Sequence, residues 1–98
     1  MKQAGSSMTS PMSYQVSLDA FDRIEERMEQ SQVRTLLGNP DRVHRGDPGG
    51  NWYDESWTYD FRKLDGFPKM DKMRAIWEGT VMFLKGKVVH TRKIGWLE

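Results

Sequence analysis

The segment from Met28 to Pro40 constrains the fold of this chain most tightly, because it predicts one short helix with an explicit end. Its apolar side chains recur three and four residues apart and form one stripe of an α-helix: Val33, Leu36 and Leu37. Gly38 suits the left-handed residue that commonly follows a helix, and Pro40 cannot continue one. The chain after residue 40 is therefore expected to be non-helical.

A second apolar stripe precedes this segment and predicts another helix beginning near Ser17. Its members are Leu18, Phe21, Ile24 and Met28. Ser17 suits the N-cap, and Asp19 and Asp22 are expected near the positive end of the helix. Residues 1–16 carry a single charge and no periodicity, which is typical of a flexible tail. Residues 17–96 are predicted to form one domain.

The chain after Pro40 has the two-residue period of β-strands. A first strand is expected at 41–45 with Val43 inward, and the turn residues at 46–51 should join it to an antiparallel second strand at 52–61. In that second strand Trp57, Tyr59 and Phe61 alternate with polar residues, as in a sheet with one covered face. A third strand near 73–84 and a fourth near 87–93 are joined by Lys85-Gly86, a turn that needs positive φ.

Helices first and strands after predict an α+β fold, with two N-terminal helices packed on one face of a three- to four-stranded antiparallel sheet. The 98 residues suffice for one two-layer core and leave no room for a second domain. The absence of cysteine excludes disulfides, thiolate zinc sites and cysteine nucleophiles. A net charge of +1 gives no global electrostatic argument for nucleic-acid binding.

The order of these elements resembles the SmpA/OmlA, or BamE-like, family of outer-membrane lipoproteins. The family pattern is Gly-Met-Thr-x-x-x-Val-x-x-x-Leu-Gly-x-Pro, followed by an aromatic strand and a closing β-hairpin. The matching residues here are Met28, Val33, Leu37, Gly38 and Pro40, then Trp57-Thr58-Tyr59 and a hairpin at 81–89. The resemblance implies a BLIP-like fold, similar to each half of β-lactamase inhibitor proteins.

Two positions depart from that pattern. Arg27 stands at the family's glycine, where a left-handed residue would cost roughly 1 kcal/mol, unless the turn between the helices differs. Glu29 stands at the N-capping threonine and is a poorer cap, so Ser31 is expected to cap the helix instead.

The resemblance also implies a function without catalysis. Family members hold other components of the outer-membrane assembly complex, contact anionic phospholipid and lie at the periplasmic face of the outer membrane. The protein is therefore expected to be a protein-binding or scaffold module in outer-membrane assembly or envelope integrity, with outer-membrane assembly components and anionic phospholipid as candidate partners. The alternative is a cytoplasmic adaptor or inhibitor that uses the same open sheet face.

The cellular location depends on what precedes this sequence. Family lipoproteins carry a signal peptide that ends in a lipid-modified cysteine, and no apolar run of ~7 to 15 residues follows Met1 here. If such a segment has been removed, the domain belongs in the periplasm at the outer membrane. If the native chain starts at Met1, it belongs in the cytoplasm.

Catalytic motifs are missing from the sequence. It contains no Gly-x-Ser-x-Gly elbow and no P-loop, and His44 and His90 lie in no metal-ligand spacing. No enzyme activity, metal or cofactor is expected. A small enzyme or ligand-binding protein would instead need a deep pocket that holds His44 or His90 beside a carboxylate.

Aromatic side chains outside the predicted core are the candidates for partner binding, because Trp and Tyr bury a large area with few rotamers. These are Trp52, Tyr53, Phe67, Trp77 and Trp96, of which at least two are expected to be exposed. The candidates for contact with anionic lipid or an acidic partner are Lys85, Lys87, Arg92 and Lys93. Nucleic acid is not an expected partner, because only Lys85-Gly86 matches the ribonucleoprotein sheet signature. The polar connection at 64–72 is of a kind that often carries function.

Overall fold

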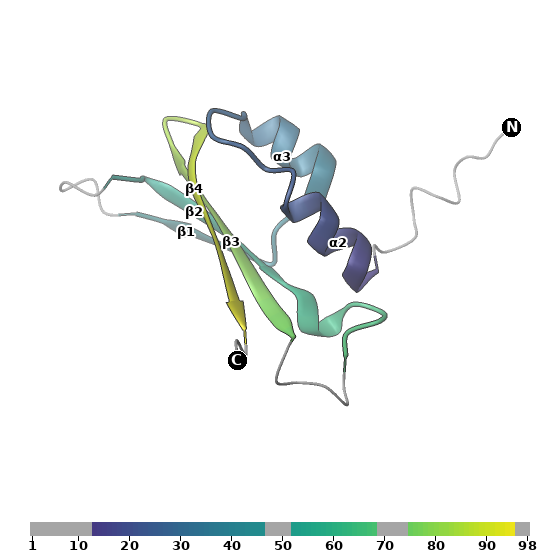
Figure 1. Cartoon of the computed structure of the whole chain (residues 1–98). Coiled ribbons are helices and arrows are strands. Elements are labelled where there is room, and N and C mark those ends of the chain that lie inside the picture. The colour runs from purple at the N-terminus through teal and green to yellow at the C-terminus, as the bar shows by residue number, and fades with distance from the viewer. Residues whose placement is uncertain (1–12, 47–51, 69–74, 96–98) are drawn as a thin grey trace, which may run out of the picture.

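The computed structural model describes residues 13–46, 52–68 and 75–95, and its elements follow the predicted order (Figure 1). Two helices come first, α2 (Tyr14–Phe21) and α3 (Gln30–Leu37). The strands are β1 (Arg42–Arg45), β2 (Glu55–Asp60), β3 (Ile76–Leu84) and β4 (Lys87–Gly95), with a short 3₁₀ helix η1 (Phe61–Lys63) after β2. Each strand pairs antiparallel with the next, in the order β1-β2-β3-β4. The predicted α+β class is confirmed.

Both helices lie on the same face of the sheet (Figure 1). The side chains between the two layers are almost all apolar: Phe21, Ile24, Val33, Leu37, Trp57, Tyr59, Phe61, Val81, Phe83 and Val88. Trp57 lies opposite Val81 and Tyr59 opposite Gly79 in neighbouring strands. Gly79 leaves room for the Phe21 ring, since a Cβ there would lie 2.8 Å from a ring carbon. The Phe21 ring of α2 therefore packs directly on the β3 backbone.

The helix predicted from the segment Met28 to Pro40 is confirmed as α3. It ends at Gly38, whose φ of +81° is a conformation that other residues rarely adopt. The Gly38 carbonyl accepts a 2.8 Å hydrogen bond from the Tyr59 hydroxyl, which joins the end of α3 to β2. Burial raises the pKa of Tyr59 above its usual range, so the hydroxyl remains protonated and able to donate.

The first helix begins and ends earlier than the stripe of apolar residues predicted. Ser13 is the N-cap of α2, and Ser17 is buried inside the helix rather than capping it. Asp22 lies at the C-terminal end of α2, not near its positive end. The reason is tertiary: the Tyr14 N–H donates to the Asp65 carbonyl (2.7 Å), and the Tyr14 hydroxyl accepts from the Ile76 N–H (2.9 Å). Residues 1–12 of the predicted tail lie outside the described residues.

The connection between the helices resolves both departures from the family pattern. Arg27 has a φ of +75°, so it adopts the left-handed conformation in place of glycine. Glu29 is the N-cap of α3, and its N–H donates to the Gln32 side chain (2.9 Å). The expectation that Ser31 caps the helix is wrong, because Ser31 lies within its first turn. The Gln32 side chain thus satisfies the N-cap amide, which is one of the two hydrogen bonds of a capping box.

The sheet is built largely as its sequence predicts. Lys85 and Gly86 both have positive φ, at 54° and 85°, and form the predicted turn between β3 and β4. The prediction that the Val43 side chain lies inward is wrong. Val43 lies opposite Trp57 but is 49% exposed, because the helices do not cover β1. The predicted turn at 46–51 lies outside the described residues apart from Gly46, as does most of the connection after Pro68.

Candidate functional site: the open face of the sheet

Neither helix lies over the sheet face turned away from α2 and α3 (Figure 1), although Ser56 and Met82 on that face are only 8% and 7% exposed. Side chains alternate along a strand, so residues between the core positions point to this face. The register places the following residues on it: Arg42 and His44 of β1; Ser56, Thr58 and Asp60 of β2; Glu78, Thr80 and Met82 of β3; His90, Arg92 and Ile94 of β4. We call this surface the open face.

The middle of the open face consists of short side chains. Thr58 and Thr80 lie opposite each other, with their hydroxyls 3.5 Å apart. In the same row across the sheet, Arg42 pairs with Thr58 and Arg92 pairs with Thr80. Two arginines thus flank a pair of hydroxyl groups, an arrangement suited to hydrogen bonding with a polar or anionic surface.

The charges of the open face are only partly neutralised. Arg42 forms an ion pair with Glu78 (3.0 Å), and Arg62 of η1 forms one with Asp60 (3.0 Å). The hydrogen bond from Arg62 lowers the pKa of Asp60 below its usual range. Arg92, by contrast, forms no ion pair with any residue that the structure describes. The part of the face near β4 therefore carries excess positive charge.

Trp52 lies at the same side of the open face as β4. It is 56% exposed, and its ring centroid lies 5.5 Å from that of His90. Tyr53, which is half-buried, packs edge-on against Trp52 with centroids 5.2 Å apart. The structure therefore brings two predicted partner-binding residues together with a histidine that the sequence analysis considered only as a metal ligand or base.

The other three aromatic candidates do not join this cluster. Phe67 packs edge-on against Tyr14, with centroids 5.4 Å apart, and so lies on the helix side of the sheet. Trp77 is half-buried, with the Arg62 guanidinium 5.3 Å from its ring centroid. Trp96 lies outside the described residues. Among the candidates that can be placed, Trp52 is the one that is largely exposed.

The four basic candidates do not form one surface. Lys87 lies 3.8 Å from the Glu29 carboxylate, and Lys93 lies 2.8 Å from that of Asp22, so both are paired with acids of the helix layer. Lys85 lies in the turn between β3 and β4, where its N–H donates to Asp54. Arg92 is the member of this group on the open face. Alternation along β4 separates Arg92 from Lys93, because neighbouring side chains point to opposite faces.

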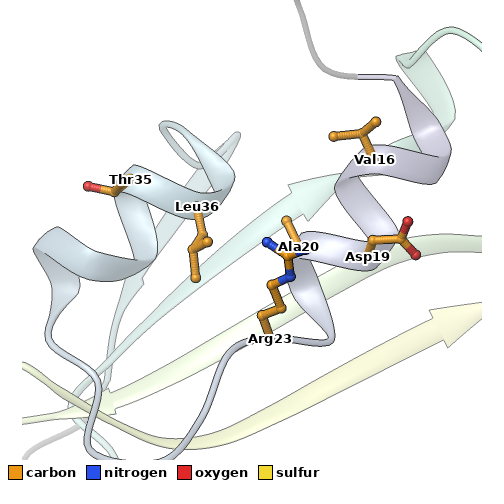
Figure 2. A pocket seen from close by; sticks show the side chains of 6 residues that line it. All are labelled: Val16, Asp19, Ala20, Arg23, Thr35 and Leu36. Carbon is orange, nitrogen blue, oxygen red and sulfur yellow. The ribbon is translucent and has the colours of Figure 1, made fainter.

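A groove of about 400 Å³ lies between α2 and α3. Figure 2 shows the side chains that line it, which come from the two helices and the start of the connection between them. Val16, Ala20 and Leu36 form its apolar part, while Asp19, Arg23 and Thr35 add polar groups. Neither histidine lines it. Within the ranges that the structure describes, no three His, Asp or Glu side chains are grouped as a metal ion would require.

Comparison of this chain with models of protein families, with curated proteins and with solved structures finds no significant match. None of the helices in the described ranges is both long enough and apolar enough to span a bilayer.

Sequence reasoning missed much of the open face. His44, His90, Thr58 and Thr80 were not among the predicted partner-binding residues. The alternation that identified Trp57, Tyr59 and Phe61 as core also indicates that Ser56, Thr58 and Asp60 point the other way. The cross-strand neighbours of those residues follow from the register, which the sequence alone does not specify.

Proposed function

We propose that this protein is a non-enzymatic binding module that holds a protein partner on the open face of its sheet. The observation that carries the proposal is the exposed Trp52 packed on His90 of the sheet face opposite the helices, where Arg92 has no ion-pair partner among the described residues. Trp and Arg are the residue types most enriched among those that dominate binding energy at protein interfaces. The excess positive charge favours a partner with an acidic surface.

We further propose that the domain is SmpA/OmlA-like and acts in outer-membrane protein assembly or envelope integrity. Two structural features support this direction. The α3 helix ends at Gly38 as in the family pattern, and Arg27 has a left-handed backbone at the position where the family has glycine. A left-handed arginine is uncommon, so the coincidence of this conformation with the family's glycine is informative. A place at the periplasmic face of the outer membrane follows from this proposal.

The positions of the histidines support a role without catalysis. His44 belongs to β1 and His90 to β4, in one row that also contains Ser56 and Met82. Two strands intervene, so the backbones of the histidines are roughly 14 Å apart at a spacing of about 4.8 Å per strand. This distance is too long for the two imidazoles to act on one atom.

Site-specific photo-crosslinking tests the proposal. A photoreactive phenylalanine replaces Trp52 or Thr80 on the open face and, as matched controls, Arg23 or Thr35 on the outer side of the helices. Each variant is incubated with the envelope and soluble fractions of the source cells and irradiated. We expect the same discrete protein adduct from positions 52 and 80 and no adduct of that size from positions 23 and 35.

The fraction that supplies the adduct distinguishes the proposed roles. An adduct with an outer-membrane assembly component from the envelope supports the SmpA/OmlA-like role. An adduct from the soluble fraction alone would keep the binding function and replace that role with the cytoplasmic adaptor or inhibitor. Adducts that form only from positions 23 and 35 would overturn the open face as the binding site.

A further inference from the structure

The β1 strand lies at one edge of the sheet, and two of its residues direct their backbone polar groups away from the sheet. The Gly46 N–H donates to the Asp54 carbonyl (2.7 Å), and with the register His44↔Ser56 this places the even-numbered residues from Arg42 to Gly46 in hydrogen-bonded pairs with β2. Asp41, just before β1, also donates its N–H to the Thr58 carbonyl (2.9 Å). In an antiparallel pair, residues that bond to the partner strand alternate with residues that do not. The N–H and C=O groups of Val43 and Arg45 therefore point to the outer edge.

This edge is open within the part of the chain that the structure describes. All four residues of β1 are exposed, and no described residue forms a backbone hydrogen bond with Val43 or Arg45 from the outer side. An uncovered edge is a template for pairing with another strand.

The opposite edge of the sheet, formed by β4, bonds to another segment of the chain. At β4, the Arg27 N–H donates to the Val88 carbonyl and the Val88 N–H donates to the Met28 carbonyl, both at 2.8 Å. Farther along, the ion pair between Lys93 and Asp22 holds the end of α2 beside the same strand. The connection between the helices thus occupies the start of the β4 edge, at Lys87 and Val88, and among the described residues β1 receives no such backbone hydrogen bonds on its outer side.

The side chains around the β1 edge specify what kind of strand would pair with it. Arg42, His44 and Arg45 make the strand basic, although Arg42 is also paired with Glu78, and Arg34 of α3 lies over the Trp57 ring, beside Val43 in the register. The nearest acid in sequence, Asp41, is already held by Lys63 and by the Asp60 N–H. Val43 adds an exposed apolar contact on the side facing the helices.

We propose that the β1 edge binds an extended acidic segment of a partner protein as an added strand. Hydrogen bonds to Val43 and Arg45 would align the segment, acidic side chains would face the arginines, and an apolar side chain would cover Val43. A second copy of this chain is a poor occupant, because antiparallel pairing of two β1 strands places basic residues opposite basic residues. This inference concerns the sheet edge and stands independently of the partner proposed for the open face.

A synthetic peptide of alternating glutamate and valine, capped at both ends, serves as the probe for the full chain. Binding is followed by amide chemical shifts and by hydrogen exchange. In the free protein the amides of Val43 and Arg45 should exchange rapidly and that of His44 slowly. With the peptide, we expect the exchange of Val43 and Arg45 to slow by at least about tenfold, as pairing satisfies both groups.

Two matched controls separate strand addition from simple charge attraction. The same peptide, N-methylated at every second amide on the side that would face β1, keeps its charge but cannot donate to the edge. In the protein, Val43→Pro removes the outward N–H without removing a bond to β2, whereas Val43→Thr keeps that N–H. We expect about tenfold weaker binding for the methylated peptide and for Val43→Pro, and near wild-type binding for Val43→Thr.

Three outcomes would overturn the inference. The methylated peptide could bind as tightly as the parent, which would reduce the contact to electrostatics. The chemical-shift changes could map to Trp52, His90 and Arg92, which would support binding at the open face and exclude binding at the β1 edge. Finally, the amides of Val43 and Arg45 could become protected in the free protein as its concentration rises, which would make a second copy the occupant.

Discussion

The two faces of the sheet are built from the same strands and differ in nearly every physical property. In β2, Trp57 and Tyr59 are buried under the helices, while Thr58, between them, lies on the open face. In β3, Val81 and Phe83 are fully buried, while Thr80 pairs with Thr58 on the other side. Most of the core therefore lies on one face, whereas among the open-face residues only Ser56 and Met82 are buried and the others remain available for binding.

The ion pairs follow the same division. Lys93 and Lys87 extend toward the helix layer and pair with Asp22 and Glu29, which lie in and beside the connection between the helices. Arg92, next to Lys93 in β4, points the other way and has no such partner among the described residues. Two neighbouring residues of β4 thus differ in role: the charge of Lys93 pairs within the fold, and the charge of Arg92 is available to a partner.

The largest effect is expected from truncating the helix side of the sheet. Trp57→Ala removes a buried ring and should lower the free energy of unfolding by about 3 to 5 kcal/mol. Thr58→Val, one residue away on the open face, should change it by about 0.5 kcal/mol or less. Urea unfolding of both variants measures the difference, and equal losses would contradict the contrast between the two faces.

The next largest loss of stability is expected from a substitution in the helix layer. Leu37→Ala should lower the free energy of unfolding by about 2 to 5 kcal/mol, because Leu37 is buried at the end of α3 against the core. Thr35→Ala, exposed on the outer side of the same helix, is the matched control and should have little effect. A melting temperature unchanged by Leu37→Ala would show that α3 does not contribute to the covered face.

A smaller effect of opposite sign is expected at Arg27, in the connection beside β4. Arg27→Gly should raise the free energy of unfolding by about 0.5 to 1 kcal/mol, because glycine adopts positive φ without steric cost. Arg27→Ala keeps the conformational cost and serves as the control. Thermal unfolding compares the variants, and a loss of stability on Arg27→Gly would mean that the arginine side chain contributes more than the backbone relief.

The smallest effect concerns the ion pair between Asp60 and Arg62, where the open face meets η1. Arg62 donates two hydrogen bonds to the Asp60 carboxylate and lowers its pKa in the folded state. The stability from this pair is therefore present above the ordinary pKa of about 3.9 and is lost as the pH falls through the lower folded value. Urea unfolding of Asp60→Asn between pH 7 and pH 2.5 should show a deficit that shrinks toward acid pH.

Arg62→Gln provides the control for that measurement. It removes the two side-chain hydrogen bonds but keeps the one from the backbone N–H of residue 62 to Asp60, so it should reproduce most of the pH dependence of Asp60→Asn, and the losses in the double variant should be less than additive. Additive losses in the double variant would mean that each side chain stabilises the fold through some other contact.

Local patterns predicted the fold where one physical rule dominated. Three- and four-residue spacing identified α3, Gly38 identified its end, and the alternation of Trp57, Tyr59 and Phe61 identified the covered face. The patterns failed where a distant contact decided the outcome. Besides the local cap at Ser13, Tyr14 is held at the start of α2 by hydrogen bonds to Asp65 and Ile76, and no window around residue 14 contains those two distant contacts.

The candidate site was predictable only in part, for a similar reason. Trp52, Tyr53 and Arg92 were identified by residue type and lie on or beside the open face. Phe67 was identified by the same criterion, an aromatic side chain outside the predicted core, but it packs against Tyr14 instead. His90 entered the site through its contact with Trp52, which joins residues far apart in sequence. Residue type indicates what a side chain can do, whereas exposure decides whether it is available.

The sequence by itself determined the order of helices and strands, the end of α3 and the side of β2 that is buried, because these depend on periodicity and backbone conformation within a few residues. Only the tertiary structure decided which charges are paired, which edge of the sheet stays open and which aromatic residue remains exposed. Those properties arise when strands with distant positions in the chain align in one register, and register is set by packing across the whole sheet.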